Sequence, residues 1–154
     1  MAPSLRYRFG IRVSVDAPIL VGRDEKTGRR QLIPILSGEV SGENGLHGTV
    51  LPGGVDCQVI RPDGRCEVSA RYAVRLDSGD GFYIQNDGVR TVPPDYARDV
   101  FDGKFVDPDL YYFCTTPRFE VFSGELAWLL DRVFICSAKR LPDAVLIDYY
   151  SVET

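Results

Sequence analysis

The sequence predicts an all-β protein, an antiparallel closed β-barrel with one or two short helices. Residues 6 to 15 alternate with period two, with Tyr7, Phe9, Ile11, Val13 and Val15 sharing one face. Glycines recur through residues 38 to 54, which makes a helix there implausible and fits short strands with bulges. Closure into a barrel removes the exposed strand edges of such a meander, and a β-sandwich is the alternative.

Further strand patterns follow, separated by turn residues. The polar segment 22 to 30 predicts a reversal into a second strand, and Arg-Pro-Asp-Gly at 61 to 64 predicts a tight hairpin turn. Prolines and charges in 92 to 109 indicate a loop with one helical turn near 96 to 101, placed to cap an opening. Ser123 is expected to cap a short helix. The expected strands are 31–36, 56–60, 65–77, 81–86, 110–116, 118–122, 133–137 and 144–152.

The length and composition are those of one globular domain spanning residues 1–154. Hydrophobic residues make up 44% and charged residues 26%, the usual balance for a folded chain. A chain of this length buries roughly 70% of the surface that it exposes when unfolded. Eight Tyr, eight Phe and one Trp supply a large apolar volume, suited to a core or to a pocket for a flat ligand.

Charge and hydropathy exclude two classes of partner. The net charge is -4 and no basic run is present, so nucleic acid is not an expected partner. The longest apolar run, Leu126 to Leu130, is too short to span a membrane. The first residues lack the apolar core of a signal peptide, so a cytoplasmic location is expected.

Metal, cofactor and triad chemistry lack the residues they need. The single histidine, His47, has no identifiable Ser or Asp partner. No glycine-rich stretch ends in the Gly-Lys-Ser/Thr of a phosphate loop. The cysteines form no Cys-x-x-Cys pair, so we expect free thiols and neither a metal site nor a cofactor. They are Cys57, Cys66, Cys114 and Cys136.

One strand carries the most suggestive polar residues. After two glycines, Asp56 and Gln58 project from the same face, which can be the lumen face. An inward Arg71 would hold Asp56 ionised, whereas apolar surroundings would raise the pKa of Asp56 and suit it to general-acid catalysis. Hydrogen bonding to neighbouring loops is the alternative role for both polar side chains.

A second segment, residues 111 to 120, concentrates aromatic and ionisable groups. Alternation places Tyr112, Cys114 and Thr116 on one face until Pro117 breaks the register. Glu120, like Asp148, is a carboxylate within an apolar strand. Such a group is an ion-pair partner by default and an acid or base by exception.

Five motifs in order resemble those of the DUF3237 (UPF0311) proteins. They are Gly48 to Gln58, Ala70 to Tyr72, Asn86 to Arg90, Thr115 to Glu120 and Trp128-Leu129, and together they span most of the chain. The resemblance implies a small single-domain β-barrel of the calycin, allene-oxide-cyclase-like kind. The sequence departs from the usual bacterial pattern at Cys57, Cys114 and Leu130, where Trp, Arg and Asn are common, and these changes make the site smaller or more apolar.

The resemblance also implies a chemistry, that of a cofactor-independent cyclase of fungal secondary metabolism. Such an enzyme adds a phenol across a prenyl olefin, an intramolecular hydroalkoxylation that forms a dihydrobenzofuran, as in the phenalenone (herqueinone) pathway. The expected substrate is a prenylated polyphenol. A non-catalytic carrier of an aromatic molecule and a structural interaction module are the alternatives, and self-association is left open.

The resulting hypothesis assigns roles to named residues. Asp56 or Glu120 is the acid, Arg71 and Arg118 hold the phenolate or a neighbouring carbonyl, and aromatic residues shape the cavity. Arg71 and Tyr72 are adjacent, so both can face the lumen only if a bulge lies between them. The catalytic set is Asp56, Glu120, Arg71 and Tyr112, and the substrate-binding set is Gln58, Tyr72, Asn86, Cys114, Arg118, Phe119 and Trp128.

Overall fold

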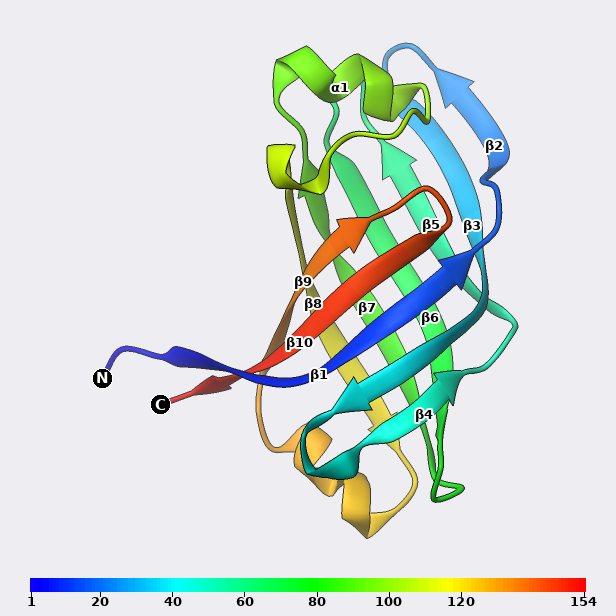
Figure 1. Cartoon of the computed structure of the whole chain (residues 1–154). Coiled ribbons are helices and arrows are strands. Elements are labelled where there is room, and N and C mark those ends of the chain that lie inside the picture. Colours follow the sequence, from blue (N-terminus) through cyan, green and yellow to red (C-terminus); the bar gives the residue numbers. More distant parts are fainter.

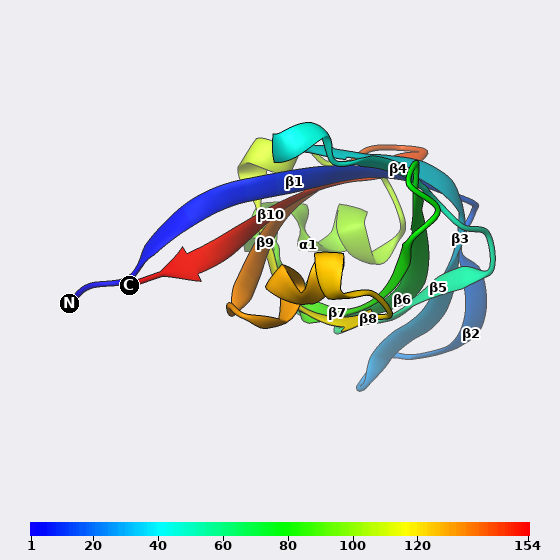
Figure 2. The ribbon, with the colours of Figure 1, turned by 90° about the horizontal axis from the view of Figure 1, so that it is seen from below.

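The computed structural model describes all of residues 1–154 and confirms the closed antiparallel barrel (Figure 1). Seen from below, the strands form a ring around a central space (Figure 2). The ring consists of β1 (Ser4–Val15), β3 (Gly28–Gly42), β5 (Gly54–Ile60), β6 (Cys66–Leu76), β7 (Gly81–Thr91), β8 (Tyr112–Val121), β9 (Phe134–Arg140) and β10 (Ala144–Glu153).

Two pairings close the ring. Strand β1 pairs with β10 on one side and with β3 on the other, and β5 joins β3 to β6. The shorter β4 (His47–Val50) continues the link between β3 and β6 toward the end that lies lower in Figure 1. The seam between β8 and β9 is the shortest, with only Cys114↔Ser137 and Thr115↔Cys136 paired.

The turns follow the sequence closely, with one difference. The Arg61 to Gly64 turn joins β5 to β6 as predicted, and the Gly64 N–H donates to the Arg61 carbonyl. The predicted polar reversal at 22 to 30 is shorter than expected. Residues 19 to 24 form strand β2 (Ile19–Asp24), which pairs with β3, so the chain reverses between Asp24 and Gly28.

A bulge in β1 changes one predicted orientation. The pairing of β1 with β10 shifts register between Tyr7 and Phe9. Phe9, Ile11 and Val13 are buried as the alternation predicts, but Tyr7 is 45% exposed and packs edge-on against Tyr150 outside the barrel. The prediction that Tyr7 shares the buried face is wrong because the extra residue of the bulge reverses the alternation.

Short helices cover both ends of the barrel (Figure 1). Helix α1 (Pro94–Phe101) and the 3-10 turn η2 (Pro108–Leu110) lie over the upper end, which confirms the predicted helical turn in that loop. The 3-10 helix η3 (Gly124–Leu130) lies at the lower end. Ser123 precedes it as predicted, but its hydroxyl makes no capping bond, so the predicted capping interaction is wrong.

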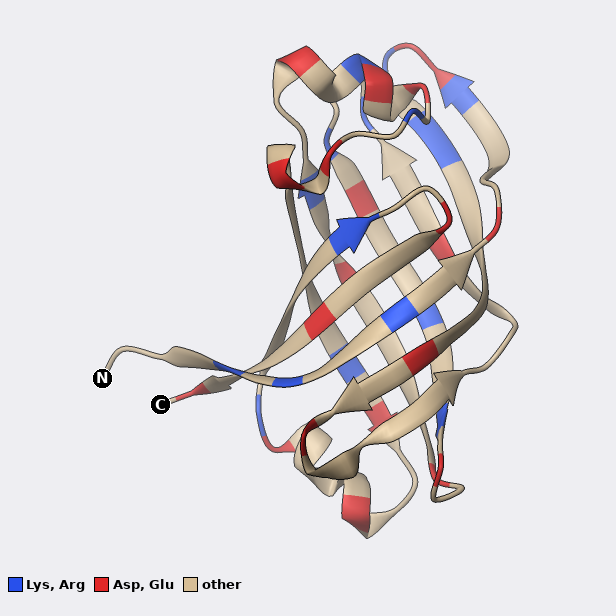
Figure 3. Ribbon diagram, in the orientation of Figure 1, with Lys and Arg blue, Asp and Glu red and all other residues tan.

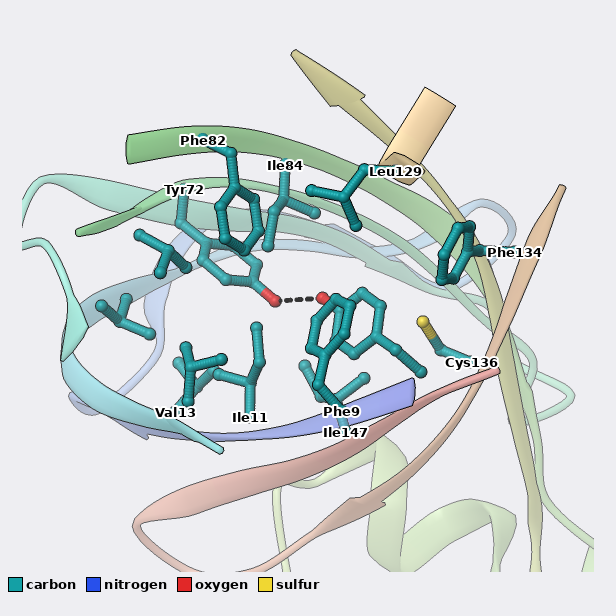
Figure 4. Packing of buried hydrophobic residues seen from close by; sticks show 14 of the residues in the cluster. Phe9, Ile11, Val13, Tyr72, Phe82, Ile84, Leu129, Phe134, Cys136 and Ile147 are labelled. Carbon is teal, nitrogen blue, oxygen red and sulfur yellow. Dashed lines mark hydrogen bonds between the residues drawn. The ribbon is translucent and has the colours of Figure 1, made fainter. Parts of the chain in front are cut away.

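Large aromatic side chains fill the lower half of the barrel (Figure 4). The rings of Phe9 and Tyr149 stack with centroids 4.4 Å apart, and Phe82, Phe119 and Phe134 pack around them. Because these rings fill the lower lumen, free space is left toward α1.

Positive and negative residues are interspersed over the strands and loops (Figure 3). None of the helices has the length and apolar character that a transmembrane span would require.

Replacing Phe9 with Ala should lower the free energy of unfolding by about 3–5 kcal/mol. The substitution leaves a void at the centre of a dense aromatic cluster. Urea denaturation followed by tryptophan fluorescence measures the loss. The control is Phe122→Ala, because Phe122 is 73% exposed and its removal should change the stability by about 0.5 kcal/mol or less. Equal losses in the two variants would contradict this account of the core.

Candidate functional site

The upper half of the lumen contains a narrow cavity of about 620 Å³, its mouth included. Inward side chains from all eight strands of the ring line it. Most of the wall is apolar, with valines and isoleucines on one side and Phe113 on the other. The polar and charged residues in the lining are Asp56, Gln58, Tyr72, Asn86, Arg90, Thr115 and Arg140. An apolar pocket with a few converging polar groups is the usual form of a small-molecule site.

The structure brings four of the predicted residues together in this cavity. Asp56 and Gln58 project inward from β5, Tyr72 from β6 and Asn86 from β7. Their inward orientation follows from the period-two alternation of their strands. The prediction that Asp56 and Gln58 face the lumen is therefore confirmed, whereas their chemical roles are untested.

The arginines assigned to substrate binding lie elsewhere. Strand β6 has no bulge at Arg71, so the inward position of Tyr72 turns Arg71 to the outer face. Arg118 is likewise exposed on β8. With the side-chain amide of Gln85 oriented so that its oxygen faces the two arginines, Arg71 donates to that oxygen at 3.0 Å and Arg118 at 3.1 Å. The prediction that an inward Arg71 pairs with Asp56 is wrong.

Strand β8 presents the opposite face from the one predicted. Pro117 pairs with Asn86 in an unbroken register, so Phe113, Thr115 and Pro117 all point inward. Tyr112 is consequently 55% exposed, and Cys114 and Glu120 share its outer face. The predicted inward orientation of Tyr112 and the predicted register break at Pro117 are both wrong.

The last two predicted residues lie inside the barrel but below the cavity. Phe119 packs against Phe134, with ring centroids 5.1 Å apart, and belongs to the aromatic core. Trp128 on η3 packs edge-on against Phe9 and lies beneath the Arg8 guanidinium. Both residues support the floor of the lumen and do not line the cavity.

Asp56 is the carboxyl group of the cavity. Its Oδ1 accepts a hydrogen bond from the Ser69 backbone N–H at 3.0 Å, and its Oδ2 accepts one from Gln58 Nε2 at 2.8 Å. Burial raises the pKa of Asp56, although those two hydrogen bonds and the charges of Arg90 and Arg140 oppose the shift. Asp56 therefore keeps its proton to higher pH than an exposed aspartate does.

Two buried glutamines extend the network that begins at Asp56. Gln31 Nε2 donates to Gln58 Oε1 at 2.9 Å, while the Gln31 Oε1 has no hydrogen-bond partner. If Asp56 is protonated, reversing both amides lets its O–H donate to Gln58 and lets Gln58 donate to Gln31. The number of hydrogen bonds is the same in both states, so the network accommodates an acid that gains and loses a proton.

Tyr72 lines the cavity and pairs with a second buried tyrosine, Tyr149. The hydroxyls of Tyr72 and Tyr149 lie 2.6 Å apart in a hydrogen bond, drawn as a dashed line in Figure 4. Burial raises the pKa of both. Nearby, Cys136 is a buried thiol whose pKa is raised to about 12 by burial, so it is unreactive. All four cysteines are free thiols, as expected.

Sequence reasoning missed the two arginines of the cavity. Arg90 is 1% exposed, and Arg140 is partly buried at the end of β9. Burial lowers the pKa of Arg140, and repulsion from Arg90 lowers it further. The signal for Arg90 was present, since Asn86 and Arg90 are four positions apart on one strand and therefore share a face. Arg140 had no such signal, because its register depends on β10.

Comparison with known proteins agrees with the fold and the family motifs. The family model described as "Protein of unknown function (DUF3237)" matches residues 3–152. This chain belongs to the DUF3237 family. Among curated relatives, a UPF0311 protein of Clostridium acetobutylicum is 55% identical over 94% of this chain and 90% of its own length. A UPF0311 protein of Rhodopseudomonas palustris is 40% identical over 99% of both chains.

Solved structures share the barrel of this DUF3237 protein. The crystal structure of a C. acetobutylicum protein of unknown function has a TM-score of 0.94 at 51% identity, covering 99% of both chains. A β-barrel-like protein from Acinetobacter baumannii has a TM-score of 0.84 at 32% identity, covering 99% and 98%. An enzyme from Penicillium herquei has a TM-score of 0.74 at 15% identity, covering 99% and 96%, and this distant likeness concerns the fold alone.

The raised pKa of Asp56 gives a pH-dependent stability with a definite sign. At pH values between the ordinary aspartate pKa near 4 and the raised pKa of Asp56, the folded protein keeps a proton that the unfolded chain has lost. This carboxyl therefore stabilises the fold at low pH, and its contribution falls as pH rises through that range. The stability of Asp56→Asn minus that of the wild type should increase with pH, by up to about 1.4 kcal/mol per pH unit within that window, and then level off.

Urea denaturation between pH 4 and pH 8 measures this difference. Asp148→Asn is the matched control, because Asp148 is an exposed carboxyl on the outer face of β10. A difference for Asp56→Asn that falls with pH would show that the carboxyl is stabilised in its ionised form instead.

Proposed function

We propose that this DUF3237 protein is a cofactor-independent cyclase that closes a cyclic ether by adding a phenol across a prenyl olefin inside the barrel. The observation that carries the proposal is Asp56, a carboxyl group with a raised pKa that points into an apolar cavity. Protonation of an unactivated olefin requires a protonated acid, and burial of Asp56 favours its protonated form.

The reaction is an isomerisation in which every atom is retained. The Asp56 proton adds to the terminal carbon of the olefin, and the phenol oxygen forms a bond to the neighbouring carbon. The phenolic proton then goes to the Asp56 carboxylate, which restores the acid. Reversal of the Gln58 and Gln31 amides would let this network support both protonation states during the cycle.

The walls of the cavity suit this chemistry. Apolar side chains keep water away from a developing cation, and the faces of Tyr72 and Phe113 supply electron-rich surfaces for positive charge. Enclosure of the substrate also holds the phenol close to the olefin, which lowers the entropic part of the barrier. Of the two predicted acids, only Asp56 retains this role, because Glu120 is exposed on the outside of β8.

The comparisons support the chemistry less directly than the cavity does. The Penicillium herquei structure with this fold is described as an enzyme, and the curated relatives named above are bacterial.

Wild-type protein should convert an ortho reverse-prenylated phenol into a dihydrobenzofuran with an excess of one enantiomer. Asp56→Asn should lower the initial rate by about 100-fold or more, because it removes the general acid. Glu120→Gln should retain the wild-type rate. Chiral chromatography of timed samples measures both the rate and the enantiomeric excess.

Racemic product at the rate of buffer alone would mean that the barrel binds without catalysis. Full activity of Asp56→Asn would exclude Asp56 as the acid. A folded Asp56→Asn variant, verified by its circular dichroism spectrum, is needed for either comparison.

A further inference from the structure

The side chain of Arg90 is buried without a counter-ion. It is 1% exposed, and its Nε, Nη1 and Nη2 atoms all lack a hydrogen-bond partner. The ion pairs of the chain join other residues, so no carboxylate lies within ion-pair distance of Arg90. A buried guanidinium without partners is costly, and the rings of Phe113 and Tyr111, 5.5 and 6.0 Å from its carbon, replace only a small part of its lost hydration.

A second positive charge shares the same end of the cavity. Arg140 lines it from β9, and its side chain also makes no ion pair. Its backbone is held in place, because the Arg140 N–H donates to the Tyr111 hydroxyl at 3.0 Å. Asp56 is the only carboxyl in the lining, and its two oxygens already accept bonds from Ser69 and Gln58. The cavity therefore has an excess of positive charge.

The two arginines stand between the cavity and the outside. Both also line an outer recess of about 530 Å³, its open side included, which lies beneath the loop after α1 and contains Lys104, Phe105 and Leu141. A ligand that enters from this recess meets Arg90 and Arg140 before it reaches Asp56. The site is thus built to attract an anion at its mouth and to enclose an apolar body below.

We infer that the ligand of this cavity is an organic oxyanion, a carboxylate or acidic enolate on an otherwise apolar aromatic skeleton, held between Arg90 and Arg140. Planar oxyanions match the fork of N–H donors on a guanidinium, which explains why arginines occupy both positions. The inference deepens the proposed function, on which it rests for the reaction at Asp56, by naming the class of the substrate.

The register of the strands gives the ligand a direction. Asp56 lies opposite Ala70, and Ala70 lies opposite Asn86. Arg90 follows Asn86 on the same face of β7, further toward α1. The anionic group therefore lies near the mouth, and the reacting end of the ligand lies deeper, beside Asp56.

A bound oxyanion also changes the acid. The positive charges of Arg90 and Arg140 oppose the protonation of Asp56 and would oppose a cation on the olefin. An oxyanion between the arginines cancels that field, so Asp56 takes up a proton when the ligand binds. Binding and activation of the acid are then one event.

Titration calorimetry with 2-naphthoate and its neutral isostere 2-naphthamide tests the inference on the full-length protein. Naphthoate should bind at least tenfold more tightly than naphthamide. Arg90→Met and Arg140→Met should each lose tenfold or more of the naphthoate affinity and change naphthamide affinity by less than threefold. Arg12→Met removes an exposed arginine on the outer face of β1 and should leave both affinities within twofold.

Thermal denaturation of Arg90→Met separates binding from folding. Removing an unpaired buried charge should leave the melting temperature unchanged or raised. If Arg90→Met fails to fold, Arg140→Met provides the same comparison from the partly buried position. Equal affinity for naphthoate and naphthamide, equal losses in Arg12→Met, or binding of chloride or phosphate with no preference for naphthoate would overturn the inference.

Proton uptake provides an independent measurement. Naphthoate binding measured in buffers of different ionisation enthalpy should show uptake of a fraction of a proton in the wild type and none in Asp56→Asn. Asp56→Asn should still prefer naphthoate. A racemic outcome in the cyclase assay with a retained naphthoate preference would overturn the proposed function alone, whereas loss of that preference with intact cyclisation would overturn the oxyanion inference alone.

Discussion

The strict alternation of side chains in a closed ring of strands determines what this protein can do. Each strand offers one face to the lumen, so a strand that slipped by one residue would turn its whole apolar set outward. Closure also leaves no free strand edge. Along the axis, residue size decides the rest. Phe9, Phe82 and Phe119 fill the lower lumen, while Ala70 and Ala138 leave space above. The cavity is therefore where the inward residues become small.

One glycine shows how closely the strands above the core approach. Gly88 lies between Asn86 and Arg90 on β7, and a Cβ atom there would come within 2.3 Å of the Cys114 carbonyl oxygen on β8. Any side chain at this position would force β7 and β8 apart. The glycine thus keeps Asn86 and Arg90 in register with Pro117 and Phe113 on β8.

Pattern in the sequence sufficed for the barrel, for the capping loop and for the inward face of β5, because each depends on local alternation or turn chemistry. It failed wherever the choice of the inward face depended on pairing with a neighbouring strand. Arg71 and Tyr72 belong to one motif, yet the pleat allows only one of them to face inward. On β8 the wrong face was assigned to the lumen, since an unbroken ladder against β7 keeps Phe113 and Phe119 inside and leaves Tyr112 and Glu120 outside.

Burial disfavours the charged form of both acids and bases in the cavity, so it raises the pKa of Asp56 and lowers the pKa of Arg140. Burial raises the pKa of Asp56, so this carboxyl can offset its lost hydration by taking up a proton, whereas a guanidinium keeps its charge in proteins. A fold selected only for stability would replace Arg90 with an apolar residue of similar length. Retaining it makes sense if an anion completes the site. The acid and the unpaired cation are then two parts of one binding site, since the ligand that neutralises Arg90 is also the one that leaves Asp56 protonated.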